Sequence, residues 1–233
     1  MATAADYVAS GLALVSIPTG QKGPSSKGWQ RPENAMTDPQ RASALRGNIG
    51  LAHAYSRPRT MALDIDDLPK ARKWLDERGV DLDALLEADD GVQISSGRRG
   101  RAKLLYRLPP GCAPIRTRQI TDPETGEVML EFRCASASGL TVQDVLPPSI
   151  HPVTGMPYRW AGKGTWKDIP QVPEAPQLAA GWPDNRKKSL FVMQLVLGRL
   201  GFGVLDRRVR QSHLGVTPFT GFHVTPSVTP IFH

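Results

Sequence analysis

Residues 60–67 (TMALDIDD) constrain the fold more than any other stretch, because this short apolar run ends in acids. Such a run predicts a buried strand that delivers carboxylates at its exposed end. Side chains alternate across a strand, so Asp64 and Asp66 fall on one face, about 6 to 7 Å apart at the backbone. The apolar residues of the run take the other face: Met61, Leu63 and Ile65. Two carboxylates on one face can hold a hard divalent cation such as Mg²⁺, which favours phosphoryl-transfer chemistry.

The acidic pattern also has other interpretations. Asp-x-Asp occurs by chance, marks metal sites in sugar-nucleotide transferases, and can belong to the start of a helix. Asp67 fits the last role, since it is a good N-cap and Pro69 suits the first helical turn. A helical apolar stripe follows and closes at a glycine: Ala71, Trp74, Leu75 and Gly79. Asp64 and Asp66 precede this cap in strand register, so capping does not explain them.

Composition narrows the class of protein. A chain of 233 residues with 40% hydrophobic residues can bury a sizeable core, as one large domain or one domain with an appendage. No stretch has the length of a membrane span or the features of a signal peptide, so we expect a soluble protein without a membrane partner. Cys112 and Cys134 lack metal-ligand spacing and indicate a reducing cytoplasm. The formal charge of +7 favours a polyanionic partner, such as nucleic acid or a nucleoside triphosphate.

Two basic, glycine-containing stretches are candidate phosphate-binding loops. Residues 20–29 form a turn-rich loop that is suited to lie over phosphates; an ordinary solvated loop with Trp29 against the core is the alternative. Residues 95–101 (SSGRRGR) lie between expected strands at 92–94 and 103–108, and could cradle a phosphate with backbone N–H groups and guanidiniums. An exposed hairpin with a solubilising tip is the alternative here. The candidate nucleic-acid-binding residues are Lys22, Lys27, Arg98, Arg99 and Arg101.

Glu131 is a third candidate carboxylate. It stands between apolar neighbours in an expected strand at 128–133, after a clear turn at 122–126. A buried, unpaired acid is costly, so Glu131 requires a metal ion or a cationic partner. An ordinary salt bridge to an arginine would also satisfy it.

The order of these features resembles the primase-polymerase (PrimPol) domain at the N-terminus of plasmid and phage replication proteins, within the archaeo-eukaryotic primase superfamily. The resemblance covers roughly residues 5–160, and the block that begins at residue 147 is the most specific. The matching segments are KGP (22–24) with GW (28–29), LDID (63–66), SG (96–97), LEFR (130–133), PPSIH (147–151), and TG (154–155) with YRW (158–160).

The resemblance implies a function for each matching position. Asp64, Asp66 and Glu131 would be the catalytic carboxylates that bind two Mg²⁺ or Mn²⁺ ions. The positions that would contact the incoming nucleotide are Ser96, Gly97, Lys103, Arg133, Ser149 and His151. Lys103 is a departure, because the family often has a histidine at this position; a lysine can donate to a phosphate as a flexible point charge but has no acceptor. This puts catalytic efficiency in question.

We expect an α/β (α+β) fold with a primase-like catalytic core, in which an N-terminal α/β unit and an RRM-like unit with a mixed or antiparallel sheet form a cleft. The expected domain organisation is a catalytic domain over residues 1–168, a proline-rich linker or wrap over 169–185, and a short helix with a poorly ordered basic tail over 186–233. The chain has no Gly-x-x-x-x-Gly-Lys-Ser/Thr loop, so unwinding would require a separate helicase.

The expected function is template-directed nucleotidyl transfer, as a DNA primase and/or DNA polymerase. Single-stranded DNA would be the template and nucleoside triphosphates the substrates, in the replication of a phage, plasmid or integrated element. Two alternatives stay open. A metal-dependent nuclease could use the same carboxylates, and a catalytically degenerate module could bind nucleic acid or nucleotide without reaction.

Overall fold

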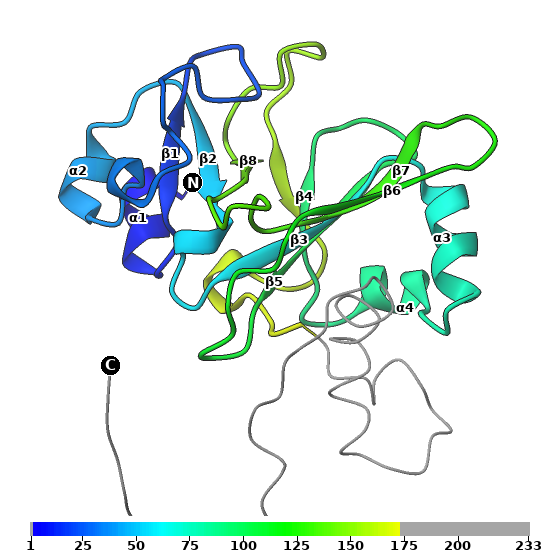
Figure 1. Cartoon of the computed structure of the whole chain (residues 1–233). Helices are drawn as coiled ribbons and strands as arrows, with labels where there is room; N and C mark the ends of the chain where they lie inside the picture. Colours follow the sequence, from blue (N-terminus) through cyan, green and yellow to red (C-terminus); the bar gives the residue numbers. More distant parts are fainter. Residues whose placement is uncertain (1, 173–233) are drawn as a thin grey trace, which may run out of the picture. The chain divides into compact units, whose positions relative to one another are not determined.

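A computed structural model of the chain describes residues 2–172. In Figure 1 a small sheet with α1 and α2 lies at the left, and a larger sheet with α3 and α4 lies at the right. The helices are α1 (Ala4–Ala9), α2 (Pro39–Ser43), α3 (Leu68–Asp76) and α4 (Leu82–Glu87). The strands are β1 (Leu14–Ile17), β2 (Asn48–Ala52), β3 (Thr60–Ile65), β4 (Val92–Ser95), β5 (Ala102–Arg107), β6 (Arg118–Thr121), β7 (Val128–Arg133), β8 (Gln143–Leu146) and β9 (Arg159–Ala161).

The small sheet has the strand order β1-β2-β8, and both of its pairings are antiparallel. Helix α1 begins with a capping box, in which the Thr3 hydroxyl accepts from the backbone N–H of Asp6 and the Asp6 carboxylate accepts from that of Thr3. Strand β8 follows β2 by some ninety residues of chain, and the five strands β3 to β7 of the larger sheet lie between them in the sequence.

The large sheet has the order β6-β7-β3-β5-β4-β9, with antiparallel pairing throughout. Strand β3, which carries the acidic run, therefore lies in the interior of the sheet between β7 and β5. The mixture of helices with two antiparallel sheets confirms the expected fold class, and the antiparallel alternative is the one that the sheet adopts. Asp67 caps α3 as expected, because its carboxylate accepts from the backbone N–H of Lys70 at 3.0 Å.

Each face of the large sheet has its own core. One face packs against α3 and α4, and the alternation of β3 is visible there. This core contains Met61, Leu63, Ile65, Ala71, Leu75, Leu82, Leu104, Tyr106, Leu130 and Phe132. The opposite face packs against α1 and the small sheet, through Tyr7, Leu14, Leu51, Ala62, Ile94, Leu105 and Leu146. Both faces are thus covered, and the second face is where the two sheets meet.

The meeting of the two sheets is apolar at one end and charged at the other. On β3, Ala62 belongs to the shared core and Asp64 is the next residue on that face. On β5, Leu105 belongs to the core and Lys103 is its neighbour on the same face. The change from apolar to charged residues along both strands places a polar site at one edge of the core.

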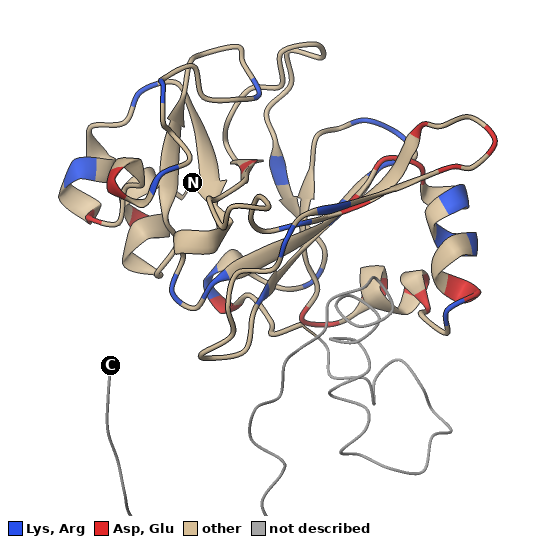
Figure 2. Cartoon of the chain, viewed as in Figure 1, with Lys and Arg blue, Asp and Glu red and all other residues tan. Residues whose placement is uncertain are grey.

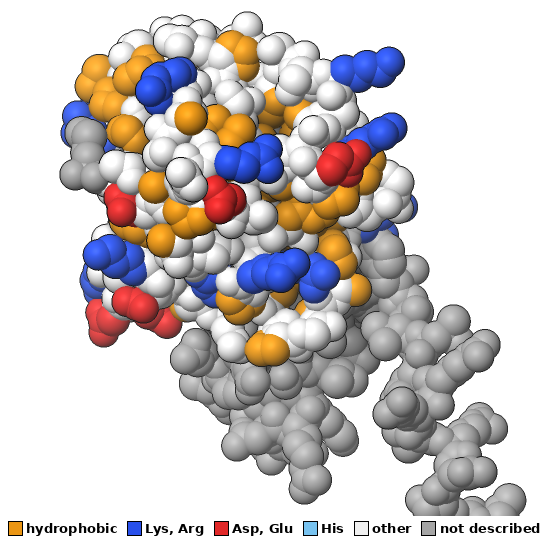
Figure 3. Space-filling model, turned by 90° about the vertical axis from the view of Figure 1, so that its left-hand side faces the viewer, with side chains coloured by type: hydrophobic (Ala, Val, Ile, Leu, Met, Phe, Trp, Pro, Cys, Tyr) orange, Lys and Arg blue, Asp and Glu red, His pale blue; other side chains and the backbone are white. Residues whose placement is uncertain are grey.

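The outer surface carries both basic and acidic side chains. Figure 2 shows basic positions on α3 and acidic ones on the β6–β7 hairpin, and an ion pair between Lys70 and Asp122 joins these elements. Figure 3 shows the side of α1 and α2, where hydrophobic, basic and acidic side chains are interspersed. The positive net charge therefore forms no continuous patch on that side.

Several boundaries differ from the expectation. The short helix α2 and strand β9 were not anticipated, and the segment after β2 forms a 3-10 turn (His53–Tyr55). The first residues of the expected linker or wrap pack onto the domain: Ile169 is buried, and Arg107 exchanges backbone hydrogen bonds with Pro170 and Val172. The expected short helix and basic tail lie outside the described residues. No helix in the described range is long and apolar enough to cross a bilayer.

Candidate functional site

A cleft of about 200 Å³ opens at the charged edge between the two sheets. Strands β3, β4, β5 and β7 of the large sheet and β8 of the small sheet all contribute to it, together with the loops that carry Lys22, Asp66, Arg98 and His151. Its lining residues are Lys22, Asp64, Asp66, Ile94, Ser96, Arg98, Arg101, Ala102, Lys103, Arg133, Gln143, Asp144, Val145, His151 and Tyr158. Charged and polar side chains therefore dominate the lining, and most of the charged ones are basic.

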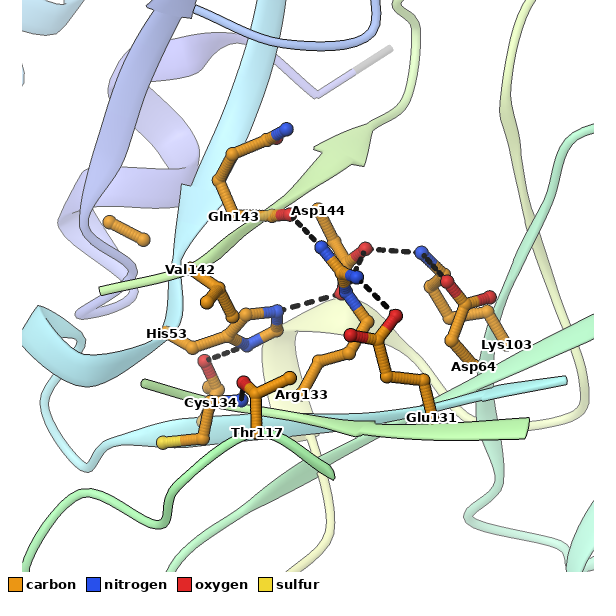
Figure 4. Close-up of polar contacts among 12 residues, drawn as sticks. His53, Asp64, Lys103, Thr117, Glu131, Arg133, Cys134, Val142, Gln143 and Asp144 are labelled. Atoms are coloured by element: carbon orange, nitrogen blue, oxygen red, sulfur yellow. Dashed lines mark hydrogen bonds and ion pairs between the residues drawn. The ribbon is translucent and has the colours of Figure 1, made fainter. Parts of the chain in front are cut away.

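Asp64 lines the cleft from strand β3 of the large sheet. In the register of the large sheet it lies opposite Lys103 of β5 on one side and opposite Glu131 of β7 on the other. Residues in register on adjacent strands point to the same face, so the three side chains converge, as Figure 4 shows. Asp64 and Asp66 both line the cleft, in agreement with the alternation of the strand.

Lys103 is held between carboxylates of the two sheets. Its Nζ lies 3.0 Å from Asp64 Oδ2 and also contacts Asp144 Oδ1 of β8. Burial by itself would lower the pKa of Lys103, but the charges of Asp144 and Asp64 outweigh burial and raise it. The side chain is therefore a permanently charged ammonium within the cleft.

Asp144 is the buried anion that joins the sheets. Its side chain is 4% exposed, and three groups surround it: the ammonium of Lys103, Arg133 Nε at 3.0 Å from Oδ1, and His53 Nε2 at 2.9 Å from Oδ2. Burial opposes the charged form of Asp144, but Arg133, Lys103 and His53 together lower its pKa far below the ordinary value. Asp144 is thus ionised at neutral pH.

His53 completes this arrangement from the small-sheet side. Its Nδ1 lies 3.0 Å from the Thr60 hydroxyl, and its Nε2 meets Asp144. Complete burial lowers the pKa of His53, although Asp144 acts in the opposite direction. A neutral ring that donates from Nε2 and accepts at Nδ1 satisfies both contacts.

Glu131 is satisfied by an arginine. Its Oε2 accepts from Arg133 Nη1 at 2.6 Å, and its side chain is only 10% exposed. Arg133 also donates from Nη2 to the backbone oxygen of Gln143 at 2.8 Å, so one guanidinium links β7 to β8. Glu131 lies behind Arg133 and does not line the cleft.

Asp66 lies just past the end of β3 and lines the cleft. Its backbone N–H donates to the oxygen of Met129 at 2.9 Å, which fixes its position beside β7. Its carboxylate forms an ion pair with Arg101, which enters from the glycine-bearing turn before β5. Within that turn Gly97 and Gly100 have φ of +75° and +71°, a conformation that favours glycine.

His151 contributes a hydrogen-bond donor without a partner. Two backbone N–H groups, those of Val153 and Thr154, donate to its Nδ1 at 3.3 and 3.2 Å. Nδ1 must then carry a lone pair, so the proton of the neutral ring is on Nε2. The residue is 1% exposed, and Nε2 has no hydrogen-bond partner among the described residues. Burial, followed by the nearby Lys22, Arg98 and Arg101, lowers the pKa of His151 and favours this neutral form.

The rim of the cleft is fixed by Asn48 at the start of β2. The buried Asn48 amide donates to the backbone oxygens of Gln21 and Ile150 at 2.9 and 2.8 Å and accepts from the Ile150 N–H at 2.9 Å. Two loops distant in sequence are thereby joined. The pKa of Lys22, on the first of these loops, is lowered by partial burial and then by Arg98, Arg101 and Lys103, which indicates a positive potential in the cleft.

Not every candidate residue reaches the cleft. Ser149 is buried, and its hydroxyl accepts from the backbone N–H of Ile49 at 2.8 Å, which joins β2 to the loop after β8. Lys27 and Arg99 are exposed and lie outside the lining. The candidate residues that the structure does bring together are Lys22, Asp64, Asp66, Ser96, Arg98, Arg101, Lys103, Arg133 and His151.

A comparison with protein families accounts for most of the chain. Residues 4–177 match the model for the N-terminal domain of bifunctional DNA primase/polymerases. The chain belongs to this family. No curated protein gave a match. The bifunctional primase/polymerase domain thus includes both sheets and every residue of the cleft.

The family generally uses divalent metal ions, and the residues present fit such an ion in part. Asp64, Asp66 and Glu131 are oxygen donors of the kind that Mg²⁺ and Mn²⁺ prefer, and they come from one side of the large sheet. Each is paired with a cationic side chain, namely Lys103, Arg101 and Arg133. Within residues 2–172 no group of three or more acidic, histidine or cysteine side chains is arranged to hold a metal ion.

Sequence reasoning missed three residues of this candidate site. They are His53, Asp144 and Tyr158, whose ring lies 5.5 Å from that of His151. A weak signal for Asp144 was available: it is an acid in residues 140–146, where Leu140, Val142, Val145 and Leu146 are apolar. His53 carried no comparable signal, because its role depends on the docking of one sheet against the other.

Proposed function

We propose that this chain carries out template-directed nucleotidyl transfer, as a DNA primase and/or DNA polymerase that serves the replication of a phage, plasmid or integrated element. One observation carries the proposal. A single cleft brings Asp64 and Asp66 together with a set of cationic side chains and an unpartnered His151 Nε2–H. This combination suits a substrate that is itself a polyanion and that reacts at a phosphorus atom.

The basic lining is suited to a nucleoside triphosphate. Hydrogen bonds between charged donors and phosphate oxygens are roughly twice as strong as neutral ones. Ser96 and the neighbouring turn offer a hydroxyl and backbone N–H groups to the same anion. The cationic side chains in question are Lys22, Arg98, Arg101, Lys103 and Arg133. His151 would donate from Nε2 to an oxygen of the nucleotide, which would satisfy its one buried polar atom without a partner.

The carboxylates would act on the reacting end of the triphosphate. Asp64 and Asp66, with Glu131 once released by Arg133, would hold Mg²⁺ or Mn²⁺; a divalent ion supplies charge neutralisation at the phosphates and lowers the pKa of the attacking hydroxyl. The chain's own contribution is alignment. The interior position of β3 holds Asp64 rigidly. The hydrogen bonds of the Asn48 amide to Gln21 and Ile150 hold the two rim loops at a fixed separation.

Single-stranded DNA would enter along the basic rim. Lys22 and Arg98 are exposed residues of the cleft lining, while Lys27 and Arg99 are exposed outside it. Contacts of this kind bind the phosphate backbone without regard to sequence. Strand separation would come from a separate helicase.

The test is the incorporation of labelled nucleotides on single-stranded DNA, with and without a primer, in Mg²⁺ and in Mn²⁺. The Asp64→Ala, Asp66→Ala double variant should lose metal-dependent product. The matched control is the Asp89→Ala, Asp90→Ala variant, which removes two exposed acids elsewhere. Product from the wild type and the control alone supports polymerase activity, and unprimed product adds primase activity. Absence of product from a folded wild-type protein that binds DNA contradicts the proposal.

A second candidate function follows from the ion pairs. Because Lys103, Arg101 and Arg133 already neutralise the three acids, the cleft could bind nucleotide or nucleic acid without catalysis. Fluorescence anisotropy with labelled single-stranded DNA separates the two functions. A binding module keeps its affinity when Asp64 is replaced by alanine and shows no incorporation in either metal.

A further inference from the structure

The ammonium of Lys103 occupies the space between two carboxylates that come from opposite sheets. Asp64 Oδ2 lies 3.0 Å from Nζ on the large-sheet side, and Asp144 Oδ1 contacts Nζ on the small-sheet side. Figure 4 shows the lysine side chain directed between them. The side chains of Lys103 and Asp144 are only 17% and 4% exposed, so this cation is enclosed rather than solvated.

An enclosed ammonium competes with a metal ion for the same oxygens. Lysine presents a compact point charge with three donors. Here Nζ donates a hydrogen bond to Asp144 Oδ1 and forms an ion pair with Asp64 Oδ2. A divalent ion on Asp64 Oδ2 would lie about 2.0 to 2.2 Å from that oxygen. It would then be within a few ångströms of Nζ, where the repulsion between like charges is strong and little screened by solvent.

The net charge of the side chains around Lys103 also limits the binding of divalent ions. The carboxylates of Asp64, Glu131 and Asp144 are joined to the two cations Lys103 and Arg133, which leaves one unit of negative charge. The neighbouring pair of Asp66 with Arg101 is neutral and does not change this balance. One divalent ion would therefore already reverse the sign of the group, and a second would meet a net positive charge.

We propose that Lys103 is a resident cation that takes the place of a divalent ion between Asp64 and Asp144, and that it thereby restricts metal binding in the nucleotide-free cleft. The inference deepens the proposed function, since it concerns how the same carboxylates take up Mg²⁺ or Mn²⁺. It assigns Lys103 a role toward the metal ions as well as toward the phosphates. Asp144 becomes the anchor that keeps the ammonium in place.

The experiment is a calorimetric titration of the nucleotide-free protein with Mn²⁺. Lys103→Met removes the charge and keeps an unbranched apolar stem, while Lys22→Met removes the same charge from the rim of the same cleft. We expect Lys103→Met to bind Mn²⁺ about tenfold more tightly or more, or to bind an additional ion, because a close like charge is gone. Lys22→Met should change the affinity less than threefold.

Two results would overturn the inference. One is a Lys103→Met protein that is folded by circular dichroism and binds Mn²⁺ no more tightly than wild type. The other is an equal gain in Mn²⁺ affinity in Lys22→Met, which would mean that the loss of any positive charge in the cleft has the same effect. If Lys103→Met does not fold, the Lys103→Met, Asp144→Asn variant removes the buried charge together with its partner. It should then bind Mn²⁺ more tightly than Asp144→Asn alone, and equal affinities would again overturn the inference.

The titration contains neither DNA nor nucleotide, so its outcome is separate from that of the incorporation assay. A chain that polymerises but shows no gain in Lys103→Met keeps the proposed function and loses this inference. A chain without polymerase activity whose Lys103→Met variant gains Mn²⁺ affinity loses the proposed function and keeps the inference.

Discussion

Asp64 of β3 lies directly opposite Glu131 of β7, and both carboxylates project from the same face of the large sheet. Like charges in register on adjacent strands destabilise a sheet. The structure offsets this repulsion with a cation on each flank, Lys103 beside Asp64 and Arg133 beside Glu131. The candidate active site therefore depends on its basic residues for stability as well as for binding.

Replacement of Arg133 by methionine should destabilise the protein strongly. The change leaves Glu131 and Asp144 as buried acids with one cation fewer, which typically costs about 3 to 5 kcal/mol of unfolding free energy. The measurement is urea unfolding followed by circular dichroism. Arg72→Met is the control, because Arg72 forms a solvent-exposed pair with Asp83 and its loss should destabilise the protein far less. Equal losses in the two variants would contradict the buried role of Arg133.

Asn48→Ala should weaken both folding and nucleic-acid binding. It leaves the backbone oxygens of Gln21 and Ile150 and the N–H of Ile150 without their partner, at a cost of about 2 to 3 kcal/mol. The rim loops would then lose their fixed separation, so affinity for single-stranded DNA should also fall. Asn34→Ala, which removes one exposed hydrogen bond to Gly28, is the control for both measurements. Unchanged DNA affinity in a destabilised Asn48→Ala protein would show that the hydrogen bonds of Asn48 to the rim loops do not contribute to DNA binding.

The salt dependence of DNA binding should distinguish basic residues in the cleft from those outside it. If Lys22 and Arg98 each contact one phosphate, their double replacement by alanine should reduce the slope of log affinity against log salt by about 1.4. Lys27→Ala, Arg99→Ala removes the same charge from positions outside the lining and should change the slope less. Fluorescence anisotropy over a series of salt concentrations measures both. Equal changes of the slope in the two double variants would mean that the bound DNA strand does not lie along the cleft.

Stability should decrease on acidification because His151 must be neutral in the folded state. The pKa of His151 is lowered from its ordinary 6.5, first by burial, so the unfolded chain takes up protons more readily than the folded one. The stabilisation is thus complete above about pH 6.5 and is lost as pH falls through the lower, folded pKa. His151→Asn keeps an acceptor for the backbone N–H groups but does not titrate. Its melting temperature should fall less between pH 7 and pH 5, with His53 accounting for part of the residual slope.

Local patterns in the sequence predict the strand that carries the site. The alternation of residues 60–67 assigns Asp64 to one face and Met61, Leu63 and Ile65 to the other, and the structure has the same arrangement. The Asp67 cap and the strand around Glu131 follow from equally local rules. These predictions are correct because strand alternation and helix capping depend on residues that are close in sequence.

The partners of the acids could not be predicted in this way. Lys103 and Asp144 are 41 residues apart and meet only because β8 pairs with β2 while facing β5. The role of Ser149 is a similar case, since its hydroxyl is engaged by a backbone N–H one hundred residues away. Both contacts result from the docking of two sheets, and no periodicity in a single segment encodes that docking.

The chain of contacts from Thr60 through His53 and Asp144 to Lys103 crosses repeatedly between the two sheets. Neither sheet contains the cleft by itself, because each supplies only part of its charges. The two units are consequently not interchangeable modules: a fragment that contains either sheet alone would lack a site, and grafting one sheet onto a different partner would not transfer it. Any shortening of this domain that retains the site must preserve both β3 and β8, together with the strands that hold them.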